Sequence, residues 1–230
     1  MLRRILALLV ASFVLAACGG KAGEDTTNPI ESITKDPLTS EEIKKVLLTL
    51  EDLPSGYSED PELTSEDEED SDEVTSGSQP CKDLMAALDA EEEEKPHGEG
   101  EIGFKESDFG PFVMEAVASF EGDKLKKTMQ TFQDAFTECR KFTTTDSEGV
   151  DTNFTAAPMS FPKLGDESVA VRLTAKEDSD FDFEIDFDLV AVRTDQNVVL
   201  MASLGFGKSM SGEDFEKLVR TAVQRVSDAA

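Results

Sequence analysis

The sequence predicts an α+β domain, with an antiparallel sheet of about five to six strands that amphipathic helices cover on one face. Several segments after residue 101 alternate apolar and polar residues, which is the period of a half-buried strand. Other segments repeat their apolar residues every three or four positions, as helices do. Short polar turns separate the strand segments, which favours antiparallel pairing. Because strands and helices do not alternate regularly along the chain, a doubly wound parallel sheet is excluded.

Four segments have the helical pattern. The first opens at the capping box Thr39-Ser-Glu-Glu42, places Ile43, Val46, Leu47 and Leu50 on its apolar side, and stops at the Leu53-Pro54 turn. The second runs from Cys81 to Leu88. The third follows Asp123, which is suited to N-capping, and the fourth opens at Ser211. The third has the most regular apolar stripe: Leu125, Met129, Phe132, Phe136 and Cys139.

Six segments have a strand pattern: 101–107, 112–120, 153–156, 168–176, 181–189 and 198–204. The clearest alternation lies in 181–189, where apolar residues alternate with the acidic row Asp182, Glu184, Asp186 and Asp188. Alternate side chains on a strand stand about 7 Å apart, whereas oxygens bound to one Ca²⁺ lie within about 5 Å of each other. We therefore interpret the acidic row as the solvent face of a strand and not as a calcium site.

Residues 1–17 have the layout of a secretion signal. Arg3 and Arg4 precede an apolar run that is too short to span a bilayer comfortably. Leu15-Ala16-Ala17-Cys18 then matches the lipobox of bacterial lipoproteins, and this resemblance implies a lipid (palmitate) on the Cys18 sulfur after cleavage. We expect a lipoprotein anchored at the extracytoplasmic face of the cell membrane. The alternative is a plain signal peptide with an incidental cysteine.

The rest of the chain is expected to form a tether and one domain. Residues 18–37 are rich in Gly, Thr, Asp and Asn and indicate a flexible tether, and 38–230 have the length of a single domain. An acidic loop at about 59–79 is too densely charged to pack and is predicted to be disordered; it could instead bind cations or a basic partner. The formal charge of −28 argues against nucleic-acid binding.

Cys81 and Cys139 remain once Cys18 is lipidated. Outside the cytoplasm two such cysteines pair more often than they stay free. We therefore predict a disulfide that joins two helices, one beginning at Cys81 and the other ending near Cys139. Closing this loop would stabilise the domain by about 4 kcal/mol in the chain-entropy model. A buried free pair and a metal site are the alternatives. Two thiols without a nearby histidine make a poor zinc site, and a redox pair usually has the Cys-x-x-Cys spacing.

The sequence shows no catalytic motif, and we predict neither an enzyme nor a cofactor or metal site. It lacks a nucleophile elbow, a phosphate loop, a zinc-protease motif and a dinucleotide fingerprint. The only histidine, His97, lies in an acidic segment bounded by Pro and Gly, where a solvated side chain is the simplest interpretation. A hydrolase that uses two carboxylates stays open as an alternative, because such chemistry needs no other residue type.

A family resemblance narrows the function. The motifs Leu-Thr-Leu-Glu-Asp-Leu-Pro-Ser-Gly-Tyr (48–57), Phe-Gln-Asp-Ala-Phe-Thr-Glu-Cys (132–139) and Leu-Gly-Asp (164–166), with a helix opening at Cys81, resemble actinobacterial lipoproteins of the PknH-type extracellular sensor domain family. The resemblance covers most of 38–228. It implies an extracytoplasmic α+β domain with a cleft, helices linked through Cys81 and Cys139, and ligand sensing. Family members often have a second disulfide, which this sequence cannot form.

Together these features predict a lipid-anchored, extracytoplasmic binding or sensor-like lipoprotein without catalytic activity. Its partners would be the membrane, reached through the lipid on Cys18, an apolar small molecule or lipid bound between sheet and helices, and a membrane protein that receives the signal. A hydrolase with a carboxylate pair and a purely structural envelope protein are the alternatives.

Overall fold

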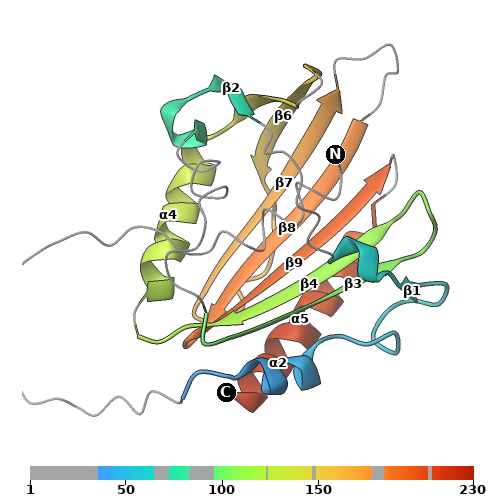
Figure 1. The fold of residues 1–230 in the computed structure, drawn as a ribbon, viewed down its shortest axis with the longest axis vertical. Coiled ribbons are helices and arrows are strands. Elements are labelled where there is room, and N and C mark those ends of the chain that lie inside the picture. Colours follow the sequence, from blue (N-terminus) through green and yellow to red (C-terminus); the bar gives the residue numbers. More distant parts are fainter. Residues whose placement is uncertain are drawn as a thin grey trace, which may run out of the picture.

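The computed structural model describes residues 36–64, 73–82, 96–122, 124–146, 149–177, 184–206 and 209–230. They form one nine-stranded sheet in the order β1-β3-β4-β9-β8-β7-β6-β5-β2 (Figure 1), in which all neighbours are antiparallel. The strands are β1 (Ser58–Glu59), β2 (Glu73–Gly77), β3 (Gly98–Lys105), β4 (Phe112–Ser119), β5 (Lys141–Thr145), β6 (Asp151–Pro158), β7 (Glu167–Glu177), β8 (Glu184–Thr194) and β9 (Asn197–Phe206).

The described helical elements are fewer than the strands. They are α2 (Ser40–Val46), the 3₁₀ turn η1 (Pro61–Leu63), α4 (Lys124–Glu138) and α5 (Gly212–Ala229). Residues 79–82 are also helical, and the remainder of the helix predicted over 81–88 lies outside the described residues, as does the predicted N-cap Asp123. The predicted caps of the other two helices are confirmed: Thr39 and Glu42 form the capping box of α2, and Ser211 caps α5.

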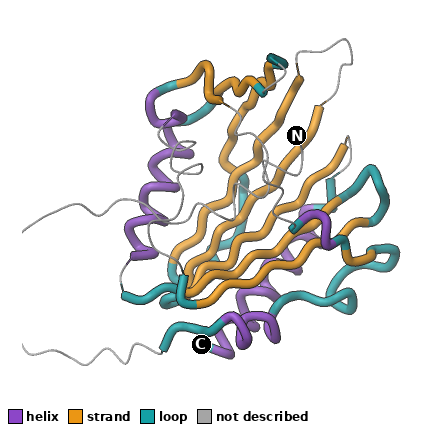
Figure 2. Tube along the Cα trace, viewed as in Figure 1, coloured by secondary structure: helices purple, strands orange, loops and turns teal. Residues whose placement is uncertain are grey.

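The predicted fold class is wrong in two respects. The sheet has nine strands and not five to six, so the described chain is mainly β. The helices also cover both faces of the sheet: α4 packs against β6, β7 and β8 on one face, whereas α5 packs against β8 and β9 on the other. Figure 2 shows α4 standing apart from α5, which lies beside α2.

The two sides of the sheet have separate apolar cores. We call the side that carries Phe187 and Leu189 of β8 the α4 face, and the side that carries Val190 and Val192 the α5 face. The central strands β4 and β9 are buried along almost their whole length because both of their sides are covered. The sequence had suggested one wet face for every strand. Alternation with small or weakly polar residues, as in β9, does not reveal that the second side is also buried.

Three strands were not predicted, namely β1, β2 and β5. Strand β1 has two residues. Strand β5 is the Thr-rich segment Lys141–Thr145, in which the buried residues are Phe142 and Thr144, so burial alternates without an alternation of apolar and polar residues. Strand β2 pairs with β5 at the edge of the sheet and falls within the predicted acidic loop at 59–79. Within that loop the structure therefore has regular elements at β1, η1 and β2, while 65–72 lie outside the described residues.

Helix α2 ends four residues earlier than the last apolar residue assigned to it. Its C-cap is Leu47, after which the chain turns so that Leu48 and Leu53 enter the core on the α5 face. Leu50, expected on the apolar side of the helix, is 44% exposed, so this part of the prediction is wrong. The turn that follows α2 brings backbone polar groups against the sheet, where they need partners.

Candidate functional site

The predicted site residues fall into two groups. Cys18, the predicted lipid attachment site, lies outside the described residues, and nothing in the structure bears on it. Cys81 and Cys139 form the predicted disulfide, with Cα atoms 4.9 Å apart. Both cysteines are buried in the core on the α4 face. The bond joins the helical turn at 79–82, which follows edge strand β2, to the C-terminal end of α4.

The acidic row of β8 is only partly a solvent face. Glu184 is exposed and Asp186 accepts a hydrogen bond of 2.8 Å from the Thr174 hydroxyl, but Asp188 is buried. The Arg172 guanidinium donates two hydrogen bonds to the Asp188 carboxylate, at 2.6 and 2.7 Å. This pairing explains how Asp188 tolerates burial, and it corrects the interpretation of that residue as solvent-facing. Asp182 lies outside the described residues.

His97 precedes β3 and has an exposed side chain. Its backbone N–H donates to the Ser119 carbonyl, while its Nδ1 lies 3.9 Å from a carboxylate oxygen of Glu121. The side chain is 39% exposed, which agrees with a solvated histidine more than with a catalytic base.

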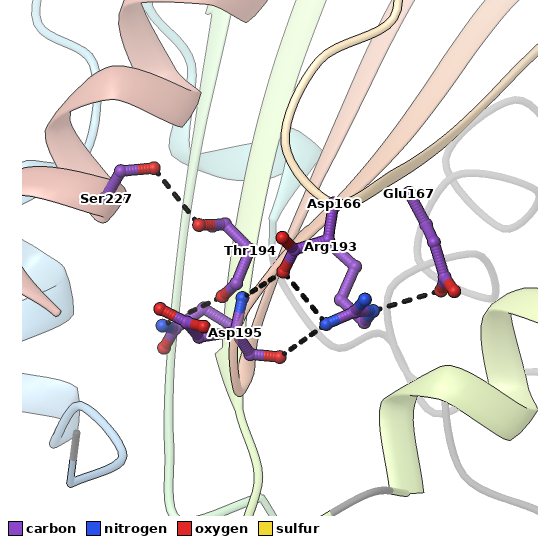
Figure 3. A network of polar contacts seen from close by, with 7 residues as sticks. Asp166, Glu167, Arg193, Thr194, Asp195 and Ser227 are labelled. Atoms are coloured by element: carbon purple, nitrogen blue, oxygen red, sulfur yellow. Dashed lines mark hydrogen bonds and ion pairs between the residues drawn. The ribbon is translucent and has the colours of Figure 1, made fainter. Parts of the chain in front are cut away.

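A network of charged groups surrounds the β8–β9 turn (Figure 3). The Arg193 side chain, 8% exposed, donates to Asp166 and Glu167 and to the Asp195 carbonyl, at 3.0 Å each. The Asp195 N–H also donates to Asp166, and a hydroxyl contact between Thr194 and Ser227 ties the turn to the end of α5. Because every one of these bonds is internal to the domain, we interpret the network as a structural staple.

The close packing of this network against the Leu-Gly-Asp motif (164–166) explains why its middle residue is glycine. Gly165 has a φ of +57°, and a Cβ at this position would lie against the Arg193 carbonyl oxygen and the Val192 side chain. Only glycine fits both the left-handed conformation and the close approach. The motif therefore has a structural reason that is independent of any ligand.

A buried carboxylate that the sequence analysis missed lies on the α5 face. Glu115 is central in β4, where it is paired with Ile102 of β3 and Met201 of β9, and its exposure is 0%. One carboxylate oxygen, Oε2, accepts a hydrogen bond of 2.6 Å from the Leu48 N–H. The other oxygen, Oε1, is buried and has no hydrogen-bond partner among the described residues.

Arg225 of α5 completes this cluster from the opposite side. Its Nη1 donates to the Leu47 carbonyl at 2.9 Å, and its Nη2 donates to the Asp52 carboxylate at 2.6 Å. Asp52 also accepts hydrogen bonds from the Thr49 N–H and hydroxyl, at 2.8 and 3.0 Å. The Leu47–Leu48 peptide group is thus held at its carbonyl by α5 and at its N–H by β4.

The pKa values of Glu115 and Asp52 are shifted in opposite directions. Burial raises the pKa of Glu115 to about 7; the Leu48 N–H and the positive charge of Arg225 oppose the shift, and the negative charge of Asp52 adds to it. Burial also acts to raise the pKa of Asp52, but the hydrogen bonds from Thr49 and the contacts with Arg225 outweigh it and lower the pKa. Glu115 is therefore a proton-binding group near neutral pH.

The sequence carries a faint signal for this site. Glu115 lies between Val113 and Val117, and these three residues share one side of a strand whose other side is also apolar. An acid in such a place is either solvent-facing or buried with partners. The Leu48 N–H that bonds to Glu115 and the Arg225 charge that acts on it lie far away in sequence, so only the folded structure brings them together.

No group of three or more His, Cys, Asp or Glu residues in the described part of the chain could hold a metal ion. Among the helices that the structure describes, none is both long and apolar enough to cross a membrane.

Comparison with known proteins supports the fold. No family model matches the chain, and no curated protein matches it by sequence. Among solved structures, the extracellular domain of PknH from Mycobacterium tuberculosis is similar, with a TM-score of 0.56 and 15% sequence identity over 84% of this chain and 98% of that domain. At this identity the similarity establishes a common fold. The resemblance inferred from the sequence is thereby confirmed as a PknH-like extracellular-domain fold.

Proposed function

We propose that the chain is a lipid-anchored, extracytoplasmic sensor-like binding domain without catalytic activity. The observation that carries the proposal is the fold shared with an extracellular domain, that of PknH. The lipobox ending at Cys18 and the disulfide between Cys81 and Cys139 agree with it, since disulfides persist in oxidising compartments. The described polar clusters support a non-catalytic role, because their side chains bond to one another and Glu115 is sealed from solvent.

The ligand we propose is an apolar small molecule or lipid on the α4 face. There the core extends beyond α4, which packs on β6 to β8, onto β9 and β4. These strands present small side chains, Ala202 and Ala116, beside larger ones such as Met114. Because these residues are buried, the ligand would lie inside the domain, in the apolar environment that binding sites for apolar molecules provide. Signal transfer would then require a partner membrane protein.

The anchor is tested by metabolic labelling of the full chain with palmitate in a bacterial host. The unchanged protein should incorporate label and stay with membranes, and a Cys18→Ser variant should do neither. Two results would overturn the anchor. One is a Cys18→Ser variant that remains equally membrane-bound, and the other is recovery of the unchanged protein from the cytosol as uncut precursor.

The ligand is tested by native mass spectrometry of protein purified from membranes. We expect an apolar small molecule to co-purify with the protein. Its occupancy should fall in Ala202→Val, because the larger side chain takes up space on the α4 face. Ala170→Val makes the same change on the α5 face and should leave occupancy unchanged. Absence of any bound mass in all three proteins, or equal loss in both variants, would contradict this ligand site without affecting the anchor.

A further inference from the structure

The segment that follows α2 is attached to the domain through buried leucines, among them Leu48 and Leu53, and through the polar contacts of one peptide group and one side chain. We define the N-terminal latch as residues 47–53, which contain the Leu47–Leu48 peptide and Asp52. The peptide carbonyl and Asp52 bind Arg225, and the peptide N–H binds Glu115. We propose that ionisation of Glu115 undocks the N-terminal latch from the sheet, so that the latch is closed in acid and opens as the pH rises through neutrality.

The surroundings of Glu115 decide this direction. Its strand neighbours, Ile102 of β3 and Met201 of β9, are apolar. The charged groups that act on it are Arg225 of α5 and Asp52 of the latch itself. Arg225 already bonds to the Leu47 carbonyl and to Asp52, and Oε1 of Glu115 has no partner. A buried carboxylate with a single hydrogen bond is unfavourable in its charged form.

The unfavourable free energy of the ionised Glu115 carboxylate can be reduced in two ways, and both disturb the latch. In the first way, water enters as the latch moves away, because Glu115 is fully buried and the Leu48 N–H of the latch lies on its carboxylate. Alternatively Arg225 can turn to Glu115, and it then leaves Asp52 and the Leu47 carbonyl. The Leu48 N–H favours the charged form, but one hydrogen bond does not offset the burial of the charge. The protonated form needs neither rearrangement.

The position of the latch gives the switch its meaning. It joins α2, the first described helix after the predicted tether, to β1 at the edge of the sheet. Opening it would free the C-terminal end of α2 from α5 while the N-terminal side keeps its own attachment, the hydrogen bond from the Leu38 N–H to Ser119. The inference concerns proton binding within the domain and does not depend on the lipid anchor or on a ligand.

Amide hydrogen exchange of residues 47–53 between about pH 5.5 and about pH 8.5 tests the inference. Protection, corrected for intrinsic rates, should fall by about tenfold or more across this range, since one pKa unit corresponds to a factor of ten. At each pH, low concentrations of urea should leave the protection of residues 47–53 unchanged, as expected for local opening. The protection of β9 amides should decrease with urea, because they exchange through larger unfolding. Glu115→Gln, which resembles the protonated acid in shape and charge, should abolish the pH dependence.

Two controls make the outcome specific. Glu51→Gln removes an exposed carboxylate from the same latch and should behave like the unchanged protein. His97→Gln is introduced into the reference protein as well as into both variants, because histidines change charge in this pH range and His97 acts on Glu42 in the α2 capping box. Protection that is constant with pH, that changes equally in Glu115→Gln, or that follows urea as β9 does would overturn the latch.

Discussion

Among single residues, Glu115 and Gly165 occupy positions where the fold restricts the residue type, for different reasons. Glu115 places a titratable group where water is excluded, so the solvation of its charge is at stake. Gly165 occupies a position where a side chain has no room and the backbone is left-handed. Neither demand arises from neighbours in sequence alone, since Glu115 depends on Arg225 and Gly165 on Arg193.

Glu115 should make stability depend on pH in a definite direction. Its pKa of about 7 in the folded protein lies above the ordinary value of 4.5, so between these values the folded state binds more protons. Its stabilising contribution is therefore complete below pH 4.5 and is lost as the pH rises through 7, by as much as about 3 kcal/mol. Urea unfolding at several pH values should show this loss, and subtracting the Glu115→Gln curve isolates it. Parallel curves for the two proteins would contradict the assignment.

Gly165→Ala should lower the free energy of unfolding by more than about 2 kcal/mol, since left-handed strain adds to a clash with the Arg193 carbonyl. The matched control is Gly122→Ala. Gly122 also has positive φ, but nothing lies within 4 Å of the added Cβ, so the expected loss is about 1 kcal/mol of strain alone. Urea denaturation measures both. Equal losses would show that the close approach at Gly165 is not limiting.

Among the elements, the edge strand β2 and helix α4 depend on each other through the disulfide. Among the described strands, β2 pairs only with β5 and is short, so its own ladder provides few bonds. The bond between Cys81 and Cys139 holds the turn after β2 against the end of α4, and Phe142 and Phe154 stack with ring centroids 4.7 Å apart on the same face. Local pairing and the covalent link thus stabilise the same corner.

Removing the disulfide should destabilise the whole domain and loosen this corner first. The Cys81→Ala/Cys139→Ala double variant is expected to lose up to about 4 kcal/mol, because the bond closes a loop of 58 residues in sequence separation. Thermal unfolding gives the loss, and limited proteolysis should cleave near β2 before it cleaves β8 or β9. Reduction of the unchanged protein should match the double variant; an unchanged unfolding temperature in both would refute the contribution.

For the whole molecule, the sheet organises two cores and the charge opposes compaction. The chain has 50 acidic and 22 basic residues, a net charge of −28. Some acids are compensated locally, as Asp188 is by Arg172, but the excess repels itself in the folded state. The two apolar clusters, one on each face, must outweigh that repulsion.

Stability should therefore increase with salt. Raising NaCl from about 0.01 M to about 1 M shortens the screening length from about 30 Å to about 3 Å, and we expect the urea midpoint to rise. The expected gain is about 1 kcal/mol or more, because repulsion among many surface acids weakens together. An equal concentration of an uncharged osmolyte separates screening from solvent exclusion. A midpoint that falls or stays constant with salt would show that repulsion is not significant.

The sequence by itself determined the location of most elements and the cysteine pairing. Period-two and helical patterns located β3, β4, β6 to β9, α4 and α5, because side-chain periodicity follows directly from local backbone geometry. It also indicated the sheet's antiparallel pairing and the PknH-like fold. Tertiary structure alone decided that helices cover both faces, that β2 and β5 join the sheet, and that Asp188 and Glu115 are buried. The physical reason is that burial and polar pairing depend on residues distant in the chain: Leu48 and Arg225 meet Glu115 only when α2, β4 and α5 are packed together.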